Sequence, residues 1–213
     1  MPSNGELNES DRDQLQEDIV LFLFDRNAIK VGNFTLSSGK KSCFYLDLRI
    51  LQSYPVYFRK AISLLTYLIH SQIGLGSFDC ICSVPTSGTI FGSALSYELF
   101  KPHIYIRKDL KSYGMQKKIE GEFNPNSKIL FVDDVITTGH SVLSGIESLA
   151  NHSNISGIVV LVDRQQGSKD IHDRFSIKIK SAIPIYHIIK ILNDKNRIDK
   201  NEYEAIKKEI KEY

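Results

Sequence analysis

The chain has 213 residues, which allows one well-packed domain and is too short for two large ones. Its composition, 42% hydrophobic and 24% charged with a formal net charge of +2, is that of an ordinary globular protein and gives no reason to expect nucleic acid as a partner. No apolar run approaches the ~20 residues of a membrane span, and the polar start of the chain is unlike a signal peptide, so we expect a cytoplasmic protein.

The first third of the chain predicts a tail, two helices and a short hairpin between them. Residues 1–10 are polar and are expected to be disordered. The helices follow from apolar residues that recur at helical spacing, and the hairpin follows from two short strand-like runs around a turn that contains glycine. In chain order we expect a helix at 13–29, strands at 32–36 and 43–49, and a helix at 57–73.

From residue 78 onward the sequence repeats an apolar strand followed by a helix. This alternation predicts a parallel sheet with helices on both faces. The runs ILFV and IVVLV are apolar throughout, which is typical of strands buried on both sides. The expected strands are 78–85, 103–108, 128–135, 157–164 and 176–183, and the expected helices are 88–100, 140–152, 167–175 and 184–192.

Two further features are interpreted as structural. The last residues, about 197–213, predict a charged surface helix with a solvated face. The three cysteines, Cys43, Cys80 and Cys82, have neither the spacing of a disulfide framework nor other metal ligands nearby. We therefore expect reduced and mostly buried thiols.

Ligands of a parallel sheet bind beyond the carboxyl ends of its strands. The predicted order places four segments along that rim, residues 83–88, 107–121, 133–141 and 163–167. Two common phosphate motifs are missing from the sequence. It has no G-x-x-x-x-G-K-[ST], and GLGSFD at 74–79 precedes a strand and lacks the third glycine of a dinucleotide fingerprint.

Two adjacent aspartates, Asp133 and Asp134, stand where a buried strand ends and lead through TTGHS at 137–141 into a helix. Backbone N–H groups of small residues at a helix start form an anion site, which suits a phosphate. The aspartates would repel that phosphate, but they can accept hydrogen bonds from hydroxyls beside it. A ribose 5-phosphate offers both a phosphate for the helix start and hydroxyls for the aspartates. The alternative is that the aspartates only end the strand and cap the helix.

The segment 107–118 carries a local excess of positive charge, because Asp109 is its single acid. Such an excess suits a diphosphate and an anionic acceptor. Gly114 and Gly121 would let the segment move, and a basic loop that closes over a cleft excludes water. An exposed loop with solvated lysines is the alternative. The basic residues are Arg107, Lys108, Lys111, Lys117 and Lys118.

The string FVDDVITTGHS, at 131–141, resembles the phosphoribosyl-diphosphate (PRPP) binding motif of the type I phosphoribosyltransferases. FTLSSGKKSCFYLDLR (34–49), IRKDLKSYGMQKKIEG (106–121) and VLVDRQQGSKD (160–170) resemble segments of orotate phosphoribosyltransferases, most closely the transferase half of eukaryotic UMP synthase. The four motifs occur in the family's order, and the resemblance runs from about residue 15 to 192.

This resemblance implies the α/β type I phosphoribosyltransferase fold, with a central mostly parallel sheet flanked by helices. It implies a single domain over 11–213, with a small N-terminal hood built mainly from residues 11–50. The implied reaction joins orotate to the ribosyl carbon of PRPP and gives orotidine 5-monophosphate and diphosphate. The family uses Mg²⁺, which is held mainly through PRPP, so we name no metal ligand in the protein.

The resemblance also implies roles for individual side chains. Lys111 would be the catalytic-loop lysine that reaches the diphosphate in the neighbouring subunit's site, and Asp133 and Asp134 would bind the ribose 2- and 3-hydroxyls. These three are the catalytic candidates. The residues implied in PRPP binding are Thr86, Ser87, Arg107, Lys108, Lys111, Tyr113, Asp133, Asp134, Thr137, Thr138, Gly139, His140 and Ser141. Those implied in orotate binding are Ser37, Tyr45, Leu46, Thr137 and Arg164.

The sequence departs from the family pattern at three positions. Ser37 stands where many relatives have lysine, Thr86-Ser87 where some have Tyr-Lys, and Ser83 where glycine is common. The resemblance implies that the loop Pro85-Thr86-Ser87-Gly88, here called the diphosphate loop, cradles diphosphate through its backbone, and the change at Thr86-Ser87 removes one positive charge from it. We expect altered affinity for PRPP rather than loss of activity.

Two other functions stay open, a phosphoribosyltransferase for a different base and a regulatory protein that binds PRPP without catalysis. The motifs RK-x-x-K-x-Y-G and LVDRQQG argue against the first, and the retained Lys111 and aspartates argue against the second. A homodimer is expected, because a loop lysine that acts in trans needs a second subunit. A separate orotidine monophosphate decarboxylase could also associate with the chain, although nothing in the sequence requires it.

Overall fold

The computed structural model describes residues 7–35, 39, 41–107, 118–149, 154–165 and 168–211. A six-stranded sheet forms the centre, with the strand order β5-β4-β3-β6-β7-β8. Five strands are parallel, and the short β5 pairs antiparallel with β4 at the edge, so the predicted mostly parallel sheet is confirmed. The strands are β3 (Cys80–Ser83), β4 (His103–Ile106), β5 (Ile119–Glu120), β6 (Lys128–Ile136), β7 (Asn154–Asp163) and β8 (Ile179–Pro184).

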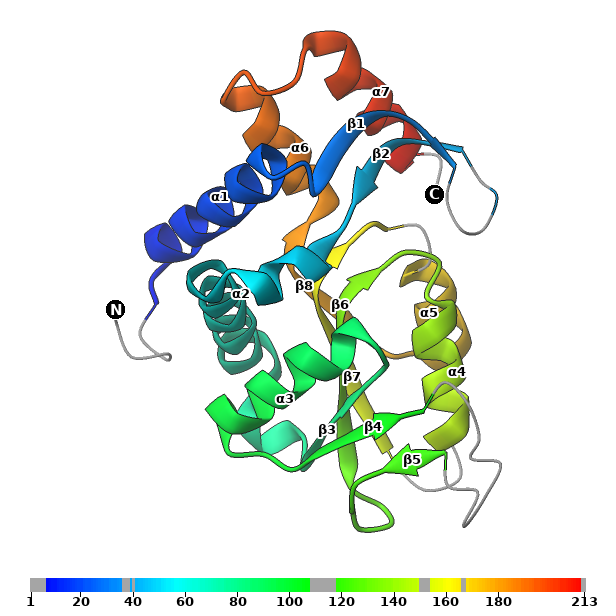
Figure 1. Cartoon of the computed structure of the whole chain (residues 1–213). Coiled ribbons are helices and arrows are strands. Elements are labelled where there is room, and N and C mark those ends of the chain that lie inside the picture. Colours follow the sequence, from blue (N-terminus) through cyan, green and yellow to red (C-terminus); the bar gives the residue numbers. More distant parts are fainter. Residues whose placement is uncertain are drawn as a thin grey trace.

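Alternate residues of the central strands pack into two separate cores, one on each face of the sheet. Leu130 and Val132 of β6 belong to one core, and Ile129 and Phe131 belong to the other. This burial on both faces is why the strand sequences are apolar without interruption. The first face is covered by α2 (Pro55–Leu68) and α3 (Ser87–Leu99), and the second by α4 (His140–Leu149) and α5 (Ser168–Phe175) (Figure 1).

The direction of winding changes between β3 and β6. From β3 the chain passes through α3 to β4 on one side, and from β6 it passes through α4 and α5 to β7 and β8 on the other. The carboxyl ends of β3 and β6 therefore border the crevice in which open α/β sheets bind their ligands.

Above the sheet lies a second layer, here called the cap, which consists of α1, β1, β2, α6 and α7 (Figure 1). The first three come from the start of the chain and the last two from its end, and ion pairs from Lys195 to Glu17 and from Arg197 to Asp25 join them. The expected hood at 11–50 is thus only part of this layer. The bounds are α1 (Glu9–Asp25), β1 (Ile29–Thr35), β2 (Lys41–Leu46), α6 (Ile185–Asp194) and α7 (Lys200–Lys211).

Two element boundaries correct the expectations from sequence. The expected disordered tail reached residue 10, but α1 begins at Glu9 because Asn8 and Asp11 form a capping box around its first turn. At the other end α7 begins at Lys200 rather than near 197, where Asp199 and Glu202 exchange the same pair of hydrogen bonds. The expected charged surface helix with a solvated face is present, and its other side packs on the core through Ile206, with Tyr203 and Ile210 partly buried beside it.

Several smaller features complete the fold. The helix expected at 57–73 is α2 continued by a π-helical turn, and it ends at Gly74, whose φ is +84°. Cys80 and Cys82 are buried and Cys43 is half-buried, all as free thiols. In the part of the chain that the structure describes, no helix is both long and apolar enough to cross a bilayer. The short helical turns are η1 (Leu48–Ser53), η2 (Ile69–Ile73) and η3 (Leu75–Ser77).

Candidate active site

The two aspartates lie at the carboxyl end of β6, beside the point where the winding changes. Asp133 is 9% exposed and Asp134 8%, and the backbone N–H of Asp134 donates to Oδ1 of Asp133 at 2.9 Å. Burial, and then the neighbouring carboxylate, raise the pKa of Asp133 well above its usual range. Two buried carboxyl groups side by side favour a ligand that donates hydrogen bonds to them.

The start of α3 is packed directly against this pair. Gly88 lies in the first turn of α3, and a Cβ atom added there would be 2.6 Å from Oδ1 of Asp133. Only glycine allows so close an approach. Thr86 and Ser87 immediately precede Gly88, so the structure brings the predicted diphosphate loop next to the aspartates, as expected from the sequence.

The segment after the aspartates turns into the N-terminus of α4. Gly139 has a φ of +74°, and α4 begins at His140. Thr138, His140 and Ser141 are exposed and Thr137 is half-buried, so the first backbone N–H groups of α4 stand beside small side chains. Unpaired N–H groups at a helix start attract anions, and a phosphate would fit here.

Arg164 follows β7 and belongs to the same rim. Its backbone N–H donates to the carbonyl of Ile136 at 3.0 Å, which ties it to the end of β6. Its side chain is 3% exposed, stacks on the ring of Phe44 at 4.1 Å, and donates from Nη2 to Oγ of Ser42 at 3.1 Å. The arginine expected to read orotate therefore connects the sheet with β2 of the cap.

Two other residues expected at the base, Tyr45 and Leu46, end β2 and are half-buried. The ring of Tyr45 packs at 5.8 Å from that of Phe34, and η1, which follows shortly after, contacts β6. Because η1 follows β2 closely and contacts β6, the end of β2 lies near the strand that carries the two aspartates. Ser37 lies outside the described residues.

The basic segment is described only at its two ends. Arg107 follows β4, its backbone N–H donates to the carbonyl of Lys118, and its Nη1 pairs with Oε1 of Glu120 on β5 at 2.7 Å. β4 and β5 thus form an antiparallel base for the intervening residues. The proposed binding residues Lys108, Lys111 and Tyr113 lie outside the described residues, and the role of Arg107 with diphosphate stays a prediction.

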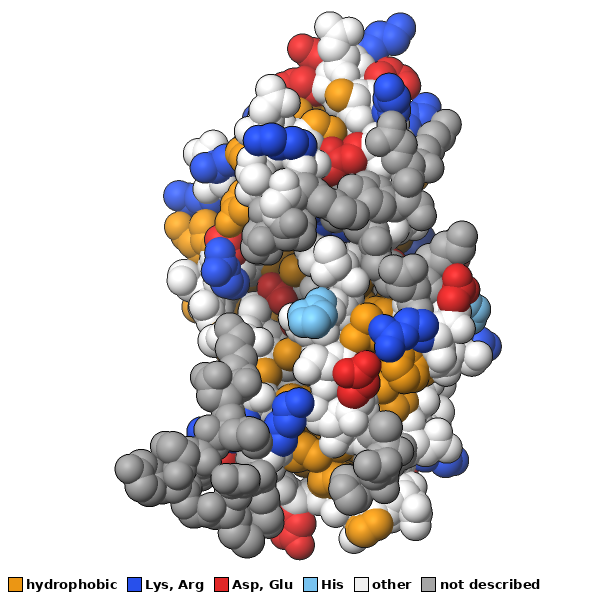
Figure 2. Space-filling view, turned by 90° about the vertical axis from the view of Figure 1, so that its right-hand side faces the viewer, with side chains coloured by type: hydrophobic (Ala, Val, Ile, Leu, Met, Phe, Trp, Pro, Cys, Tyr) orange, Lys and Arg blue, Asp and Glu red, His pale blue; other side chains and the backbone are white. Residues whose placement is uncertain are grey.

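Figure 2 shows a hollow between the cap and the sheet, with acidic atoms deep inside it. The two aspartates at the end of β6 are both buried. Within the described ranges, no three His, Cys, Asp or Glu side chains gather in a way that could hold a metal ion.

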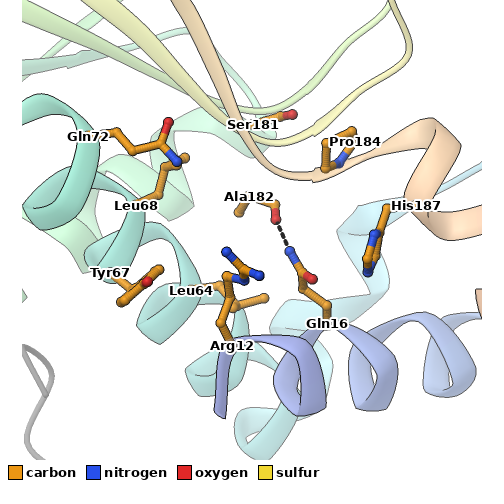
Figure 3. A pocket seen from close by; sticks show the side chains of 10 residues that line it. All are labelled: Arg12, Gln16, Leu64, Tyr67, Leu68, Gln72, Ser181, Ala182, Pro184 and His187. Atoms are coloured by element: carbon orange, nitrogen blue, oxygen red, sulfur yellow. Dashed lines mark hydrogen bonds between the residues drawn. The ribbon is translucent and has the colours of Figure 1, made fainter. Parts of the chain in front are cut away.

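A separate pocket of about 260 Å³ lies among α1, α2, β8 and the start of α6 (Figure 3). It adjoins β8 at the edge of the sheet, with β7 between it and β6. Its one arginine, Arg12, is paired with Asp13, and Gln16 donates to the carbonyl of Ala182 at 2.6 Å. Among its described lining residues Arg12 is the one Lys or Arg, which is too little positive charge for the expected diphosphate site.

Three residues that contact Arg164 or its partners were not predicted from the sequence, namely Ser42, Phe44 and Glu209. The first two alternate along β2 and so point to the same side, which is a weak signal in a half-exposed strand. Glu209 comes three residues after Ile206, which is 1% exposed, and therefore lies near the buried stripe of α7. Nothing local distinguishes it from the exposed acids of the same helix.

Comparison with known proteins places this arrangement among characterised relatives. A family model described as the phosphoribosyl transferase domain matches residues 57–190. The orotate phosphoribosyltransferase of Cenarchaeum symbiosum (strain A) is 39% identical over 149 residues, which make up 70% of this chain and 74% of that protein. That of Sulfolobus acidocaldarius is 34% identical over 190 residues, 89% of this chain and 94% of that protein.

The same likeness holds for solved structures. The structure of UMP synthase from Leishmania donovani superimposes with a TM-score of 0.79 and 27% identity over 93% of this chain. The chain spans 42% of that longer protein. The family model covers Thr86, Asp133 and Arg164, whereas Ser42 and Glu209 lie outside its limits.

Proposed function

This chain belongs to the phosphoribosyl transferase domain family and, within it, to the orotate phosphoribosyltransferases, and we propose that the rim around Asp133 and Asp134 is its active site. It is a pentosyltransferase of UMP biosynthesis. In the proposed site the phosphoribosyl group of PRPP passes to orotate, giving orotidine 5-monophosphate and diphosphate.

The observation that carries the proposal is the meeting of three binding functions at one edge of the sheet. The N-terminus of α4 suits the 5-phosphate, and the buried pair of Asp133 and Asp134 suits the ribose hydroxyls. Arg164, anchored to the end of β6, supplies a positive charge for the carboxylate of orotate. These groups follow the neighbouring strands β6 and β7, and their chemistry suits a ligand made of phosphate, ribose and base.

In the reaction, the bond between the ribosyl carbon and the diphosphate oxygen breaks, and a ring N–H nitrogen of orotate bonds to that carbon while its proton passes to water or to an oxygen of the departing diphosphate. Positive charge develops on the ribose and negative charge on the departing diphosphate. The carboxylates beneath the ribose and the basic loop above the diphosphate oppose these charges, so the protein acts by positioning and electrostatic stabilisation. Orotate is already an anion, and a strong general base is not required.

The donor chemistry of the site fits a magnesium ion held mainly by PRPP. Mg²⁺ takes oxygen ligands and keeps several waters, and it binds through one or two carboxylates plus substrate phosphates. Asp133 and Asp134 offer such oxygens beside the expected ribose. When bound, the ion would neutralise part of the diphosphate charge.

We further propose a cytoplasmic homodimer in which the loop with Lys111 serves the neighbouring subunit. In support, the base of this loop is held at the sheet edge by β4, β5 and the pair of Arg107 with Glu120, away from the aspartates of β6. Arg107 and Lys118 thus lie at the edge of the sheet, which is the side that a second copy of the chain can approach.

The deciding experiment is turnover with PRPP, Mg²⁺ and orotate, followed by the ultraviolet absorbance of orotate, with uracil and hypoxanthine in parallel. Loss of the orotate signal with release of diphosphate is expected, without use of the other two bases. Turnover with another base only would overturn the assignment of Arg164, and no turnover with any base would favour a PRPP-binding regulator.

A further inference from the structure

A buried polar network joins three distant segments of the chain behind the orotate end of the proposed site. Glu209, on the last helix, accepts a hydrogen bond from Oγ of Ser42 at 2.8 Å and another from the backbone N–H of Cys43 at 2.7 Å. Arg164 donates to the same Oγ of Ser42, and its Nη2 lies 4.0 Å from Oε1 of Glu209. The side chains of Arg164 and Glu209 are 3% and 13% exposed.

The hydroxyl of Ser42 has one proton, which limits how this network can be arranged. Its two acceptors are Glu209 and the carbonyl of Phe44, at 2.8 and 2.9 Å. A hydrogen bond to a charged group is the stronger of the two, so the proton is directed to Glu209. The lone pairs of the same oxygen then face Arg164, and Ser42 transmits the position of the carboxylate to the guanidinium.

Arg164 is fixed from two directions by this arrangement. The ring of Phe44 covers one face of its guanidinium at 4.1 Å, and Ser42 holds one of its nitrogens in the plane. A guanidinium carries five N–H donors in a rigid planar fork, so contacts to one face and to one nitrogen define its orientation. Glu209 also anchors the backbone of β2 by accepting the hydrogen bond from the N–H of Cys43. Burial, and then the neighbouring Glu209, raise the pKa of the Cys43 thiol to about 12.

We propose that Glu209 is a positioning residue for orotate: through Ser42 it sets the orientation of Arg164, and through Cys43 it sets the place of β2. The inference rests on the proposed function, because it concerns how the same site recognises its base. Glu209 lies outside residues 57–190, which the family model matches, and is supplied by α7 at the far end of the chain. The helix α7 therefore contributes to recognition of the base, in addition to forming part of the surface.

The test compares steady-state kinetics of Glu209→Ala and Glu209→Gln with the unaltered protein, varying orotate and PRPP separately. We expect Glu209→Ala to raise the KM for orotate about tenfold, which corresponds to loss of a charge-assisted hydrogen-bond network, while the KM for PRPP and kcat change less than about twofold. Glu209→Gln retains one acceptor of the same shape and should restore part of the affinity for orotate.

Two controls separate positioning from general damage. Glu204→Ala removes a carboxylate from the same helix whose side chain is 57% exposed, and it should leave both KM values unchanged. Ser42→Ala should mimic Glu209→Ala, and the double variant should be no worse than either single one, because both act through one path. Thermal unfolding of each variant confirms that the compared proteins are folded.

The outcomes distinguish this inference from the proposed function. If the unaltered protein does not use orotate, both are wrong. If it does, and Glu209→Ala leaves the KM for orotate unchanged or raises both KM values and lowers kcat alike, only the positioning role is overturned. Additive effects of the Ser42 and Glu209 substitutions would also contradict it.

Discussion

Gly88 is the residue at which the proposed site has least room. Its missing side chain lets the first turn of α3 lie against Asp133, and the predicted Cβ contact of 2.6 Å is too short to be accommodated without movement. The sequence motif explains why a small residue follows the diphosphate loop. The contact explains why glycine in particular is needed.

We predict that Gly88→Ala lowers kcat/KM for PRPP about a hundredfold, because displacement of a binding group by about 1 Å has effects of that order. Steady-state kinetics with saturating orotate would measure it. Gly76→Ala is the matched control, since a Cβ there meets nothing within 4 Å. Equal behaviour of the two variants would show that the approach of α3 to Asp133 is unimportant.

Asp133 makes the stability of the unliganded protein depend on pH. Burial raises its pKa above the value of about 4 that an unfolded aspartate has. Its contribution to stability is therefore full below pH ~4 and is lost as pH rises through the raised pKa. We predict that Asp133→Asn unfolds at a higher temperature than the unaltered protein at neutral pH and no longer binds PRPP.

Thermal unfolding from pH 4 to pH 8 would measure this effect as a gap in Tm that widens with pH. Asp173→Asn, at an exposed aspartate of α5, provides the comparison and should show no such gap. A constant gap for Asp133→Asn would mean that the carboxyl group titrates normally in the folded protein.

At the scale of elements, the loop between β4 and β5 is predicted to supply charge in the transition state. Lys111→Ala should lower kcat about 10²- to 10³-fold, as removal of one stabilising group of an active site commonly does, with a smaller change in the KM for orotate. Stopped assays of product formation would measure it. Lys190→Ala, at a lysine 56% exposed on α6, should remain fully active.

The elements that could be predicted from sequence are those with local signals. The apolar strands β6 and β7 and the string from Asp133 to Ser141 carry their signature within a few residues. β5 could not be predicted, because two residues have no periodicity and its pairing depends on β4. The packed side of α7 was not predicted for a similar reason, since Tyr203, Ile206 and Ile210 mark it among many charged neighbours.

On the scale of the whole molecule, the proposed dimer predicts complementation between inactive variants. Lys111→Ala lacks the loop lysine, and Asp134→Asn lacks a ribose-binding carboxylate. If the loop acts in trans, an equimolar mixture that exchanges subunits should regain about a quarter of normal activity, because half of the dimers are mixed and each has one intact site. Activity assays before and after mixing would show it, with each variant incubated alone as control.

One part of the site could not be predicted from the sequence, because it depends on contacts between distant segments of the chain. Because β6 and β7 are parallel neighbours, the residues that follow them lie at the same end of the sheet. This shared position of Asp133, Arg164 and the start of α4 could be predicted from the sequence. The link from Glu209 to Ser42 spans 167 positions and depends on how the two chain ends meet in the cap. No pattern within either segment indicates that meeting.

The construction of the cap from both ends of the chain has a consequence during synthesis. The helix α1 and the hairpin are synthesised before α6 and α7, against which they also pack. At 5–20 residues per second the interval between the synthesis of β2 and that of α7 is roughly 10–30 s, during which α1 can pack on α2 but not yet on α6. The base-binding side of the proposed site can therefore be completed only after translation has passed α7, so a chain interrupted before that point would contain the sheet and the two aspartates but would lack Glu209.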